Sequence, residues 1–349
     1  MRYIGGKSLL LDDIGAAIND NMENVNSAID IFCGSGAVSQ YFKHQGYRTF
    51  TNDYLYFCYV IQRGTTSLNR RPSFKKLGIK NPIKYLNQLE ASDTDISLND
   101  CFIYNNYSPN DHCNRMYFQP QNALKIDIIR LTIENWRNQN LIDDNGYFYL
   151  LASLINAVPY VSNITGIYAA YPKFWDARTY NKLELKDPKD EGLIFSNRKN
   201  NRSFNEDYHE LLHLRSDLLY ADPPYNEREY LPNYHILETI ARYDYPEIKG
   251  KTGMRDYKDK KSLFCSKKTV ARAFEELVAG SNSRYILISY NSESLMSTEE
   301  LSAICRQYAI NNSFRLIQRD YRKYKNKIPN NTPGLREQYK SYSVRDTVE

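Results

Sequence analysis

A short apolar segment that ends in a glycine-rich turn most constrains how this chain can fold. The residues "SAIDIFCGSGAVSQYF" are typical of a strand at 28–33, a turn containing Gly34 and Gly36, and the start of a helix. The segment "RTFTND" then predicts a second strand that ends at Asp53. A strand, a helix and a second strand in this order form a parallel unit, so we expect an α/β protein with a doubly wound sheet.

Four later segments predict further strands of the same sheet, because each carries a short apolar or alternating run. Helical patterns at 267–280 and 297–309 lie between the last three of them, as the crossover connections of a parallel sheet require. The four segments are "GLIFSN" at 192–197, "SDLLYADPPY" at 216–225, "SRYILISYN" at 283–291 and "FRLIQRDYRKY" at 314–324.

A segment with a different composition separates the first two predicted strands from the later ones. Residues 66–188 are polar and basic at their start, and they contain an amphipathic helix at 122–139 and an apolar helix at 147–158. A chain of 349 residues is long enough for two domains. We therefore predict a discontinuous α/β domain of residues 1–65 and 189–349, interrupted by a mainly helical domain.

The sequence predicts neither a membrane span nor an exported protein. It contains no run of about 18 apolar residues. The start "MRYIGGKSLLLDDIG" reaches an acid at Asp12 without the basic-then-apolar order of a leader. The six cysteines show no paired Cys-x-x-Cys spacing, so we expect neither a disulfide framework nor a zinc ribbon. The expectation is a soluble cytoplasmic protein with reduced thiols.

The glycine turn and the acids around it predict a nucleoside site. Gly34 and Gly36 open a helix whose backbone N–H groups can face a ligand, and Asp30 precedes them. Asp53 follows Gly36 by 17 residues, close to the roughly 20 at which an acid at a strand end reaches a ribose. The turn lacks the third glycine of a pyrophosphate site and the Lys-Ser/Thr pair of a phosphate loop. The expected ligand is therefore a nucleoside without a pyrophosphate.

The stretch "DPPY" at 222–225 predicts a site that holds an amino group. Pro223 and Pro224 lack backbone donors and have a fixed φ, so the carbonyl groups there remain free acceptors with set directions. Asp222 and a rigid carbonyl form a paired acceptor for an NH2 group, and Tyr225 offers a flat face for a ring. Two acceptors on a nucleobase amine would aim its lone pair at an electrophile. In duplex DNA that base must first leave the stack.

Three separated basic runs favour a polyanion-binding surface. Residues 62–84 contain seven basic side chains and no acid, residues 249–272 nine against two, and residues 315–327 six against one. The second run follows the "DPPY" motif, so we expect it to contact DNA phosphates. The predicted phosphate contacts are Lys249, Lys251, Arg255, Lys260 and Lys261.

A further pattern points to a different chemistry. "HELLH" matches H-E-x-x-H, in which His209 and His213 bind zinc one helical turn apart and Glu210 acts as a base. Its helix is short, and no further histidine follows at the extended spacing. Two histidines on a connecting helix are the simpler interpretation, so we predict no metal site. About one tightly held zinc per chain would instead indicate a metalloprotease.

In their order along the chain, these motifs resemble those of bacterial DNA adenine methyltransferases of the DNA adenine methylase type. "RYIGGKSLLLDDI" resembles their amino-terminal cofactor motif, "DIFCGSG" their glycine motif, "ND" at 52–53 their ribose-binding strand end and "DPPY" their catalytic motif. Segments of the insert such as "SNITGIYAAYPKFW" resemble the target-recognition part of a restriction-modification subgroup.

The resemblance implies a Rossmann-like, S-adenosylmethionine-dependent methyltransferase sheet with an inserted target-recognition domain. It implies methyl transfer from S-adenosylmethionine, without a metal, to the N6 amino group of adenine in double-stranded DNA. A cognate restriction endonuclease that acts separately is the implied partner. The same acceptor pair would also fit a cytosine amine, RNA or a protein amide. A non-catalytic DNA-binding module is a further alternative. The presence of Lys7 and of the complete "DPPY" motif argues against it.

The resemblance also assigns roles to individual residues. Lys7 faces the carboxylate of the cofactor and Asp53 its ribose, while Asp222 lies near both the cofactor and the adenine. Tyr3 stands where tryptophan is frequent, which keeps a ring at that position. The complete cofactor set is Tyr3, Lys7, Asp30, Gly34, Gly36, Asp53 and Asp222, and the catalytic set is Asp222, Pro223, Pro224 and Tyr225.

Overall fold

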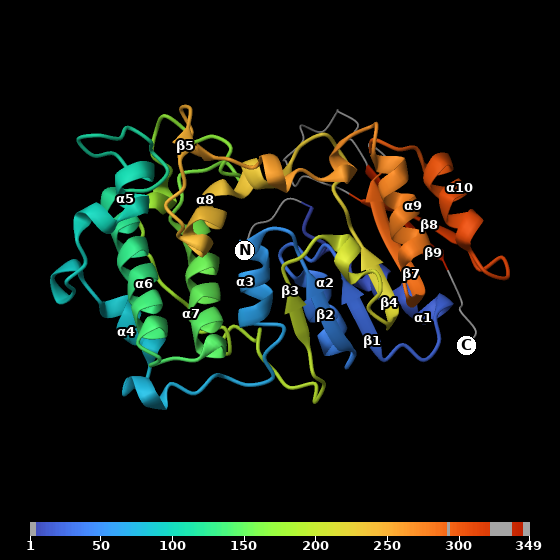
Figure 1. Cartoon of the computed structure of the whole chain (residues 1–349), viewed down its shortest axis with the longest axis horizontal. Coiled ribbons are helices and arrows are strands. Elements are labelled where there is room, and N and C mark those ends of the chain that lie inside the picture. Colours follow the sequence, from blue (N-terminus) through green and yellow to red (C-terminus); the bar gives the residue numbers. More distant parts are fainter. Residues whose placement is uncertain (1–4, 292–293, 322–336, 345–349) are drawn as a thin grey trace, which may run out of the picture.

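The centre of the molecule is a β-sheet with helices on both faces. The computed structural model describes residues 5–291, 294–321 and 337–344. These residues form a seven-stranded sheet in the order β3-β2-β1-β4-β7-β9-β8 (Figure 1). The first five strands in this order are parallel, and β9 is antiparallel to both of its neighbours. The strands are β1 (Ser27–Asp30), β2 (Arg48–Asn52), β3 (Arg202–Phe204), β4 (Ser216–Ala221), β7 (Ser283–Asn291), β8 (Arg315–Tyr321) and β9 (Glu337–Val344).

The strand order creates a crevice above β1 and β4. From this central pair the sheet extends to β2 on one side and to β7 on the other, so the winding direction reverses here. In α/β sheets, ligands bind at such a reversal, beyond the carboxyl ends of the strands. Ile29 of β1 is paired with Phe50 of β2 and Leu219 of β4, and all three side chains are at most 3% exposed. Burial on both faces explains why these strands are almost continuously apolar in sequence.

Each face of the sheet is covered by its own pair of helices. Leu218 of β4 packs on the side of α1 and α2, whereas its neighbour Leu219 packs on the side of α9 and α10. The helices predicted at 267–280 and 297–309 are confirmed as α9 and α10. The four helices are α1 (Leu11–Asn21), α2 (Ala37–His44), α9 (Val270–Gly280) and α10 (Thr298–Tyr308).

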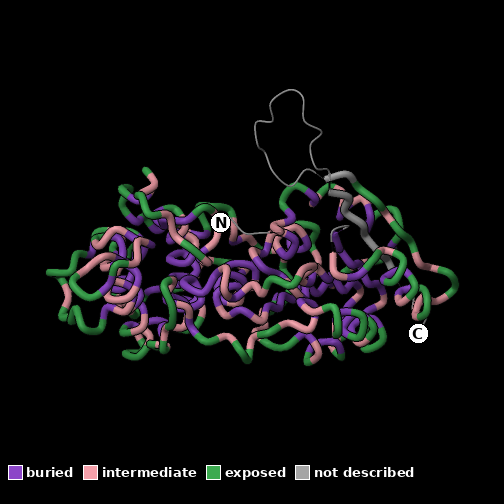
Figure 2. The backbone as a smooth tube through the Cα atoms, turned by 90° about the horizontal axis from the view of Figure 1, so that it is seen from above, coloured by how far each residue is buried: buried purple, intermediate pink, exposed green. Residues whose placement is uncertain are grey.

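A second group of helices lies beside the β3 edge of the sheet (Figure 1) and has a continuous core. Buried residues extend along the length of the molecule in Figure 2. The helices predicted at 122–139 and 147–158 are confirmed as α6 and α7. Their core also includes α3, which follows β2, and α8, which follows β4, so it extends beyond residues 66–188. The members are α3 (Tyr56–Gly64), α4 (Pro82–Gln88), α5 (Phe102–Tyr107), α6 (Pro120–Asn138), α7 (Asp144–Ala157) and α8 (Tyr230–Arg242).

Helices α3 and α7 cross at a glycine. A Cβ atom on Gly64 would lie 2.2 Å from the carbonyl oxygen of Phe148 and 2.7 Å from the Cβ atom of Ala152. Both distances are far below van der Waals contact, so the crossing leaves no room for any side chain at residue 64. The helix that leaves β2 is thereby packed directly against the helical part of the molecule.

The prediction of a strand at 192–197 is wrong. The third strand of the sheet is β3 at Arg202–Phe204, and the earlier segment is irregular. The Phe195 ring stacks on the ring of His44 in α2 with a centroid separation of 4.0 Å, and the Lys43 ammonium lies 4.6 Å from the centre of the same ring. The apolar side chains that suggested a strand therefore cover a helix instead of entering the sheet.

Among the described strands, β9 and those of a short hairpin were not predicted from the sequence. The residues of β9, "EQYKSYSV", are more polar than those of the other central strands. The hairpin follows α8 and is formed by β5 (Ile248–Lys249) and β6 (Met254–Arg255), which are too short to show a period. Across the described residues, no helix combines the length and apolar character needed to cross a membrane.

Candidate active site

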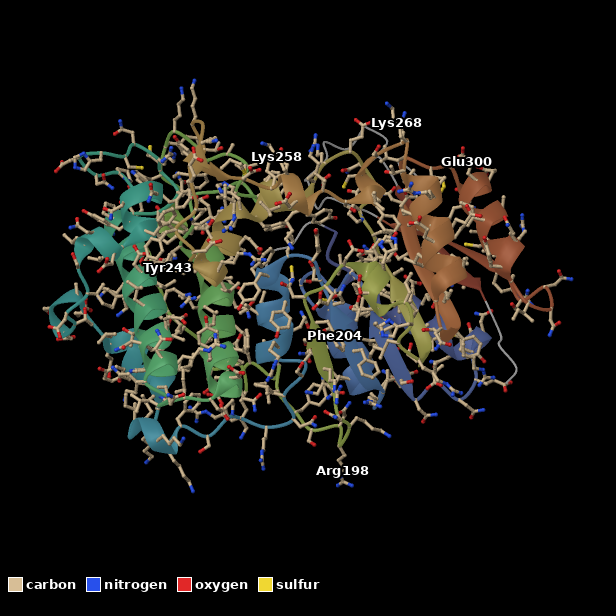
Figure 3. The ribbon with its side chains drawn as sticks, in the orientation of Figure 1. Arg198, Phe204, Tyr243, Lys258, Lys268 and Glu300 are labelled. Atoms are coloured by element: carbon tan, nitrogen blue, oxygen red, sulfur yellow. The ribbon has the colours of Figure 1, made fainter. Side chains whose placement is uncertain are left out.

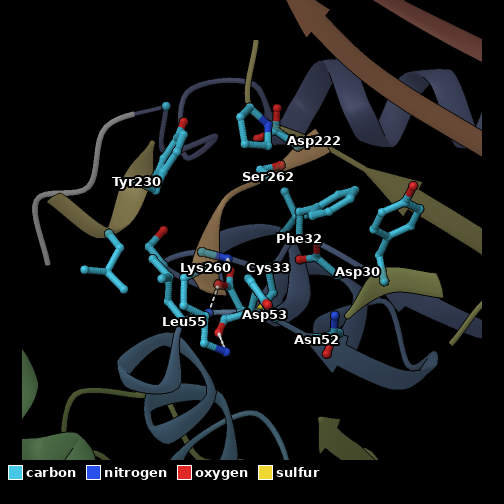
Figure 4. Close-up of a pocket in the computed structure, with 18 of the residues that line it drawn as sticks. Asp30, Phe32, Cys33, Asn52, Asp53, Leu55, Asp222, Tyr230, Lys260 and Ser262 are labelled. Atoms are coloured by element: carbon cyan, nitrogen blue, oxygen red, sulfur yellow. Dashed lines mark hydrogen bonds between the residues drawn. The ribbon is translucent and has the colours of Figure 1, made fainter. Parts of the chain in front are cut away.

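A cleft opens at the strand-order reversal, above the carboxyl ends of β1, β2 and β4. It encloses about 1070 Å³ when its open mouth is included. Its wall comes from the amino-terminal segment, the glycine turn, the ends of β2, β3 and β4, the start of α8 and the stretch 260–263. Figure 4 shows Asp222 and Tyr230 toward one end of the cleft and Asp53 and Lys260 toward the other.

Lys7 and Asp222 form an ion pair in this cleft. Lys7 Nζ donates to Asp222 Oδ2 at 2.5 Å and to the Gly5 carbonyl oxygen at 2.9 Å, and the Lys7 side chain is only 6% exposed. Burial raises the pKa of Asp222, while the charge and hydrogen bond of Lys7 act in the opposite direction. The structure thus brings together two predicted site residues that are 215 positions apart in the sequence.

The glycine turn has backbone conformations that favour glycine. Gly34 has a φ of +48° and Gly36 a φ of +83°. A Cβ atom on Gly36 would also lie 2.0 Å from the side-chain nitrogen of Gln62, so this position lacks space as well as an ordinary dihedral angle. Gly36 is the N-cap of α2, and Gly34 and the first residues of that helix line the cleft.

The two predicted acids of the cofactor site, Asp30 and Asp53, are buried at strand ends. Asp53 accepts hydrogen bonds from the backbone N–H of Gly34 at 2.8 Å and of Leu55 at 2.9 Å. Burial raises the pKa of Asp53 to about 6 and that of Asp30 to about 7. Oδ2 of Asp30 accepts from the Ser39 hydroxyl at 2.6 Å, but its Oδ1 is buried without a hydrogen-bond partner among the described residues. A ligand that donates to this oxygen would satisfy it.

Three cleft residues beyond β3 were missed by the sequence prediction. Glu206, Asp207 and Tyr208 follow this strand and line the cleft. "GLIFSN" is more apolar than the true strand "RSF", so composition places the strand end at Asn197 and not before these residues. The available signal was the "NED" run at 205–207, which follows a short segment of β-forming residues.

The DPPY motif leaves β4 and turns along the cleft. Asp222 and Pro224 line the cleft, whereas Pro223 is buried and Tyr225 packs against the core on the α9 side. The carbonyl oxygen of Tyr225 accepts from the backbone N–H of Leu295 at 2.9 Å. Among the described residues, the aromatic side chain that lines the cleft after this motif is Tyr230, which the sequence did not single out.

Three of the residues predicted to contact phosphates lie on the β5–β6 hairpin. Lys249 and Lys251 are exposed, and Lys249 Nζ lies 3.2 Å from a carboxylate oxygen of Glu247. Arg255 is different because it is buried and donates two hydrogen bonds, of 3.1 and 2.6 Å, to the carboxylate of Asp244. The structure therefore gives Arg255 an internal partner and leaves the two lysines at the surface.

The other two predicted phosphate contacts, Lys260 and Lys261, line the cleft. Lys260 Nζ lies 3.7 Å from the centre of the Tyr54 ring and donates to the Tyr54 carbonyl oxygen at 3.3 Å. The Tyr54 hydroxyl in turn donates to the carbonyl oxygen of Asp259 at 2.5 Å. These contacts hold the stretch 258–263 against the Asp53 end of the cleft. Lys258, at its start, lies on the upper rim in Figure 3, whereas Arg198 is at the opposite edge.

Two further sequence predictions concern Tyr3 and the "HELLH" segment. Tyr3 lies outside the described residues. Tyr208–Leu211 is a 3-10 turn, so the α-helical turn that would align His209 and His213 for zinc is not formed. The two ring nitrogens of His209 lie 2.6 Å from Asp207 and 2.9 Å from Glu276. In the described part of the chain, no group of three or more possible metal ligands converges.

The sheet and the cleft together define an α/β protein with an open cleft at the switch point of its parallel strands. The family model for D12 class N6 adenine-specific DNA methyltransferases matches residues 3–304, and the chain belongs to this family.

Three relatives show how far the similarity extends. Over 99% of its length the chain is 44% identical to the type II methyltransferase M.FokI of Planomicrobium okeanokoites, and over 94% it is 41% identical to modification methylase StsI of Streptococcus sanguinis. These alignments cover 53% and 49% of the two relatives, so the chain spans about half of their length. The type II methyltransferase M.NlaIII of Neisseria lactamica is 33% identical over 93% of this chain and 92% of its own length.

Proposed function

We propose that this chain transfers the methyl group of S-adenosylmethionine to the N6 amino group of adenine in double-stranded DNA. The observation that carries the proposal is the position of Asp222, which faces Lys7 in the cleft at the end of a stiff, proline-flanked strand. Membership of the adenine-specific family and similarity to named modification methylases support it. The proposed physiological role is the modification half of a restriction-modification system, with a separate endonuclease that cuts the same DNA sequence.

The residues of the cleft fit S-adenosylmethionine as the donor. Oδ1 of Asp30, which is buried and unpartnered among the described residues, would accept a hydrogen bond from the cofactor's ammonium group. Lys7 would face the carboxylate, and Asp53 the ribose. Asp207, at the end of the third strand, would face the adenine end of the cofactor. When bound, the cofactor supplies a methyl group on a positively charged sulfur, which needs no metal activation.

In the proposed reaction, Asp222 and the Pro223 carbonyl group hold the two hydrogens of the adenine amine. This arrangement draws the nitrogen lone pair out of conjugation with the ring and fixes its direction, so the chain contributes alignment and charge stabilisation. Tyr230, which lines the same end of the cleft as Asp222, provides an aromatic face for the extruded base. The Asp222 side chain is only 21% exposed, which limits the competition of water for the acceptor.

We assign methyl transfer and recognition of the DNA sequence to different parts of the chain. Residues 1–65 and 189–349 would form a Rossmann-like methyltransferase domain, with the cleft at its sheet. Residues 66–188 would form the target-recognition domain, which shares its core with α3 and α8. The shared core would keep the recognition surface in a fixed position relative to the cleft.

The test is expression of the chain in a bacterium without adenine methylation, followed by sequencing with modified-base detection. We expect N6-methyladenine in one short sequence context. The Asp222→Ala variant should produce none while still binding S-adenosylmethionine measurably. Glu227→Gln is the matched control, because this carboxylate is close in sequence but exposed. Methylcytosine, labelled RNA or labelled protein as the product would change the substrate, and full activity of Asp222→Ala would refute the assigned roles.

A further inference from the structure

A buried asparagine fixes the loop that follows α7. Asn163 is completely buried, and its backbone N–H donates to the Tyr117 carbonyl oxygen at 2.8 Å. Its side chain holds both the preceding segment and the far side of its own loop, so the loop backbone is constrained at several points. The side-chain amide donates to the carbonyl oxygens of Met116 at 2.9 Å, Pro172 at 3.2 Å and Phe174 at 3.1 Å, and Oδ1 accepts from the Asp176 N–H at 3.1 Å.

This fixed loop holds an apolar ring in solvent. Phe174 is 73% exposed, more than any other large apolar side chain that the structure describes. Its own carbonyl group is one of the acceptors of Asn163, so the exposed ring is attached to a constrained backbone. Exposure of a phenyl ring opposes the hydrophobic effect, and single exposed rings are common on protein surfaces. What distinguishes Phe174 is the buried asparagine that fixes its backbone and the segments to which its loop is joined.

The Phe174 loop is joined through tyrosine rings to the basic β5–β6 hairpin. The ring of Tyr171 packs on Tyr117 at 4.7 Å, and Tyr117 packs on Tyr107 at 5.9 Å between ring centres. The Tyr107 hydroxyl then donates to the carbonyl oxygen of Gly253 in the hairpin at 2.8 Å. The hairpin lies at the upper rim in Figure 1. Its tip is held by Arg115, which donates to the carbonyl oxygens of Gly250 at 3.1 Å and Lys251 at 3.2 Å.

The same loop is tied to the helix that begins at the cleft. The Tyr168 N–H donates to the Asn233 carbonyl oxygen at 2.7 Å, and His235 Nε2 lies 3.0 Å from the Tyr168 carbonyl oxygen. Both partners belong to α8, whose first residue, Tyr230, lines the cleft. The loop that carries Phe174 is therefore linked by packed rings to the basic hairpin and by hydrogen bonds to the helix that begins at the cleft.

We propose that Phe174 is a wedge that enters the DNA base stack beside the adenine that leaves the helix. The proposal rests on the proposed function. Exposed Lys173 precedes Phe174 in the sequence, and exposed Lys249 and Lys251 lie on the hairpin that the tyrosine rings join to this loop, so the exposed ring belongs to a surface that also carries cations for phosphates. Apolar side chains inserted between base steps unstack them, and extrusion of the target base is easier once its neighbour is unstacked.

The experiment uses a duplex that contains the target sequence with 2-aminopurine in place of the target adenine. Binding of the wild-type protein should raise the fluorescence several-fold, and Phe174→Ala should lose most of that rise. Single-turnover methylation of an ordinary duplex by this variant should fall roughly 10- to 100-fold, because part of the unstacking free energy is lost. Affinity for S-adenosylmethionine should be unchanged, and Phe174→Trp should retain activity.

Two controls separate a wedge from a structural role. Tyr85→Ala removes another exposed aromatic ring, 41% exposed and packed on Trp136 at the far end of α6, and should behave as wild type. A mismatch at the target adenine lowers the free-energy cost of extruding this base, so Phe174→Ala should recover most of its rate on a mismatched duplex. Equal impairment on both duplexes, or wild-type rates on the ordinary one, would overturn the wedge. A wild-type protein that methylates no DNA adenine would overturn the proposed function itself.

Discussion

The ammonium nitrogen of Lys7 lies 2.5 Å from Oδ2 of Asp222, and it is the one cation that the structure brings within hydrogen-bond distance of this carboxylate among the described residues. The lysine comes from the amino-terminal segment and the acid from the end of β4. The proposed function gives Lys7 a second anion to neutralise, the cofactor carboxylate. Lys7 therefore couples binding of the cofactor carboxylate to the ionisation of Asp222, the proposed acceptor for the adenine amine.

We predict that Lys7→Met weakens catalysis and moves its pH dependence. The positive charge of Lys7 lowers the pKa of Asp222 against the opposing effect of burial, so its removal raises that pKa further. The ionised acid is the acceptor, and the acid limb of the kcat/KM profile should therefore move to higher pH. At neutral pH the loss should be roughly 2 kcal/mol or more, about 30-fold. Lys7→Arg keeps the charge, and its profile should stay in place; an unmoved profile for Lys7→Met would contradict the prediction.

We predict that Asp30→Asn stabilises the cofactor-free protein at high pH. The pKa of Asp30 rises from 3.8 to about 7 because of burial, so the folded state binds this proton more tightly than the unfolded chain does. The contribution of Asp30 to stability is therefore most favourable below about pH 4 and is lost as pH rises toward about 7. Urea unfolding at pH 5 and pH 8 should show that the variant's advantage grows with pH, to on the order of 2–4 kcal/mol. Cofactor affinity should fall, and an advantage independent of pH would refute the assignment.

We predict that Gly36→Ala weakens cofactor binding in addition to the loss of stability that backbone strain at this position causes. The new Cβ atom would collide with the side chain of Gln62, in addition to the cost of a φ of +83°. Gly46→Ala is the matched control, because Gly46 has a φ of +81° with no atom within 4 Å of an added Cβ. Both variants should lose about 1 kcal/mol of stability from strain. Gly36→Ala should also weaken cofactor binding in calorimetry, whereas equal affinities in the two variants would contradict a role for the turn.

We predict that the basic residues of the hairpin differ in what they contribute. Lys249→Ala combined with Lys251→Ala should leave the free energy of unfolding nearly unchanged. It should reduce the slope of log affinity for DNA against log salt by about 2, because two counterion-releasing contacts are lost. Arg255→Ala should instead lower stability by about 2 kcal/mol, since it removes a buried partner of Asp244 and Thr239. If Arg255→Ala lowered the salt slope without a loss of stability, Arg255 would be a phosphate contact and not a structural residue.

The sequence predicted most of the α/β part because local patterns decide it. Apolar strands such as "SAID" and "SDLLYA" are buried on both sides, and the turn at Gly34 and Gly36 requires glycine, so both leave clear signals. The third strand was misassigned because "RSF" is only partly buried at the sheet edge, whereas Phe195 is apolar for another reason. An apolar residue looks the same in the sequence whether its side chain is buried against a helix or within a sheet.

Several of the predicted site residues line one cleft, but their arrangement could not be predicted from the sequence. Chemistry in the DPPY motif identified Asp222, and the cleft includes it together with Lys7, Asp30 and Asp53. The roles of Arg255 and Lys260 could not be read from charge alone, since their partners Asp244 and Tyr54 are set by tertiary contacts. Asp207 and Tyr230 required the true end of β3 and the true path of the chain after β4.

The crossing of α3 and α7 at Gly64 limits how this molecule can respond to its substrate. Two backbones in direct contact cannot slide or hinge past each other without breaking a close-packed interface. Because α3 also follows β2 directly, this interface should hold the helical part in place beside the sheet, and the deformation needed for chemistry should fall on the nucleic acid. Small-angle scattering of the free and DNA-bound protein should accordingly give the same protein envelope, with a bent duplex beside it.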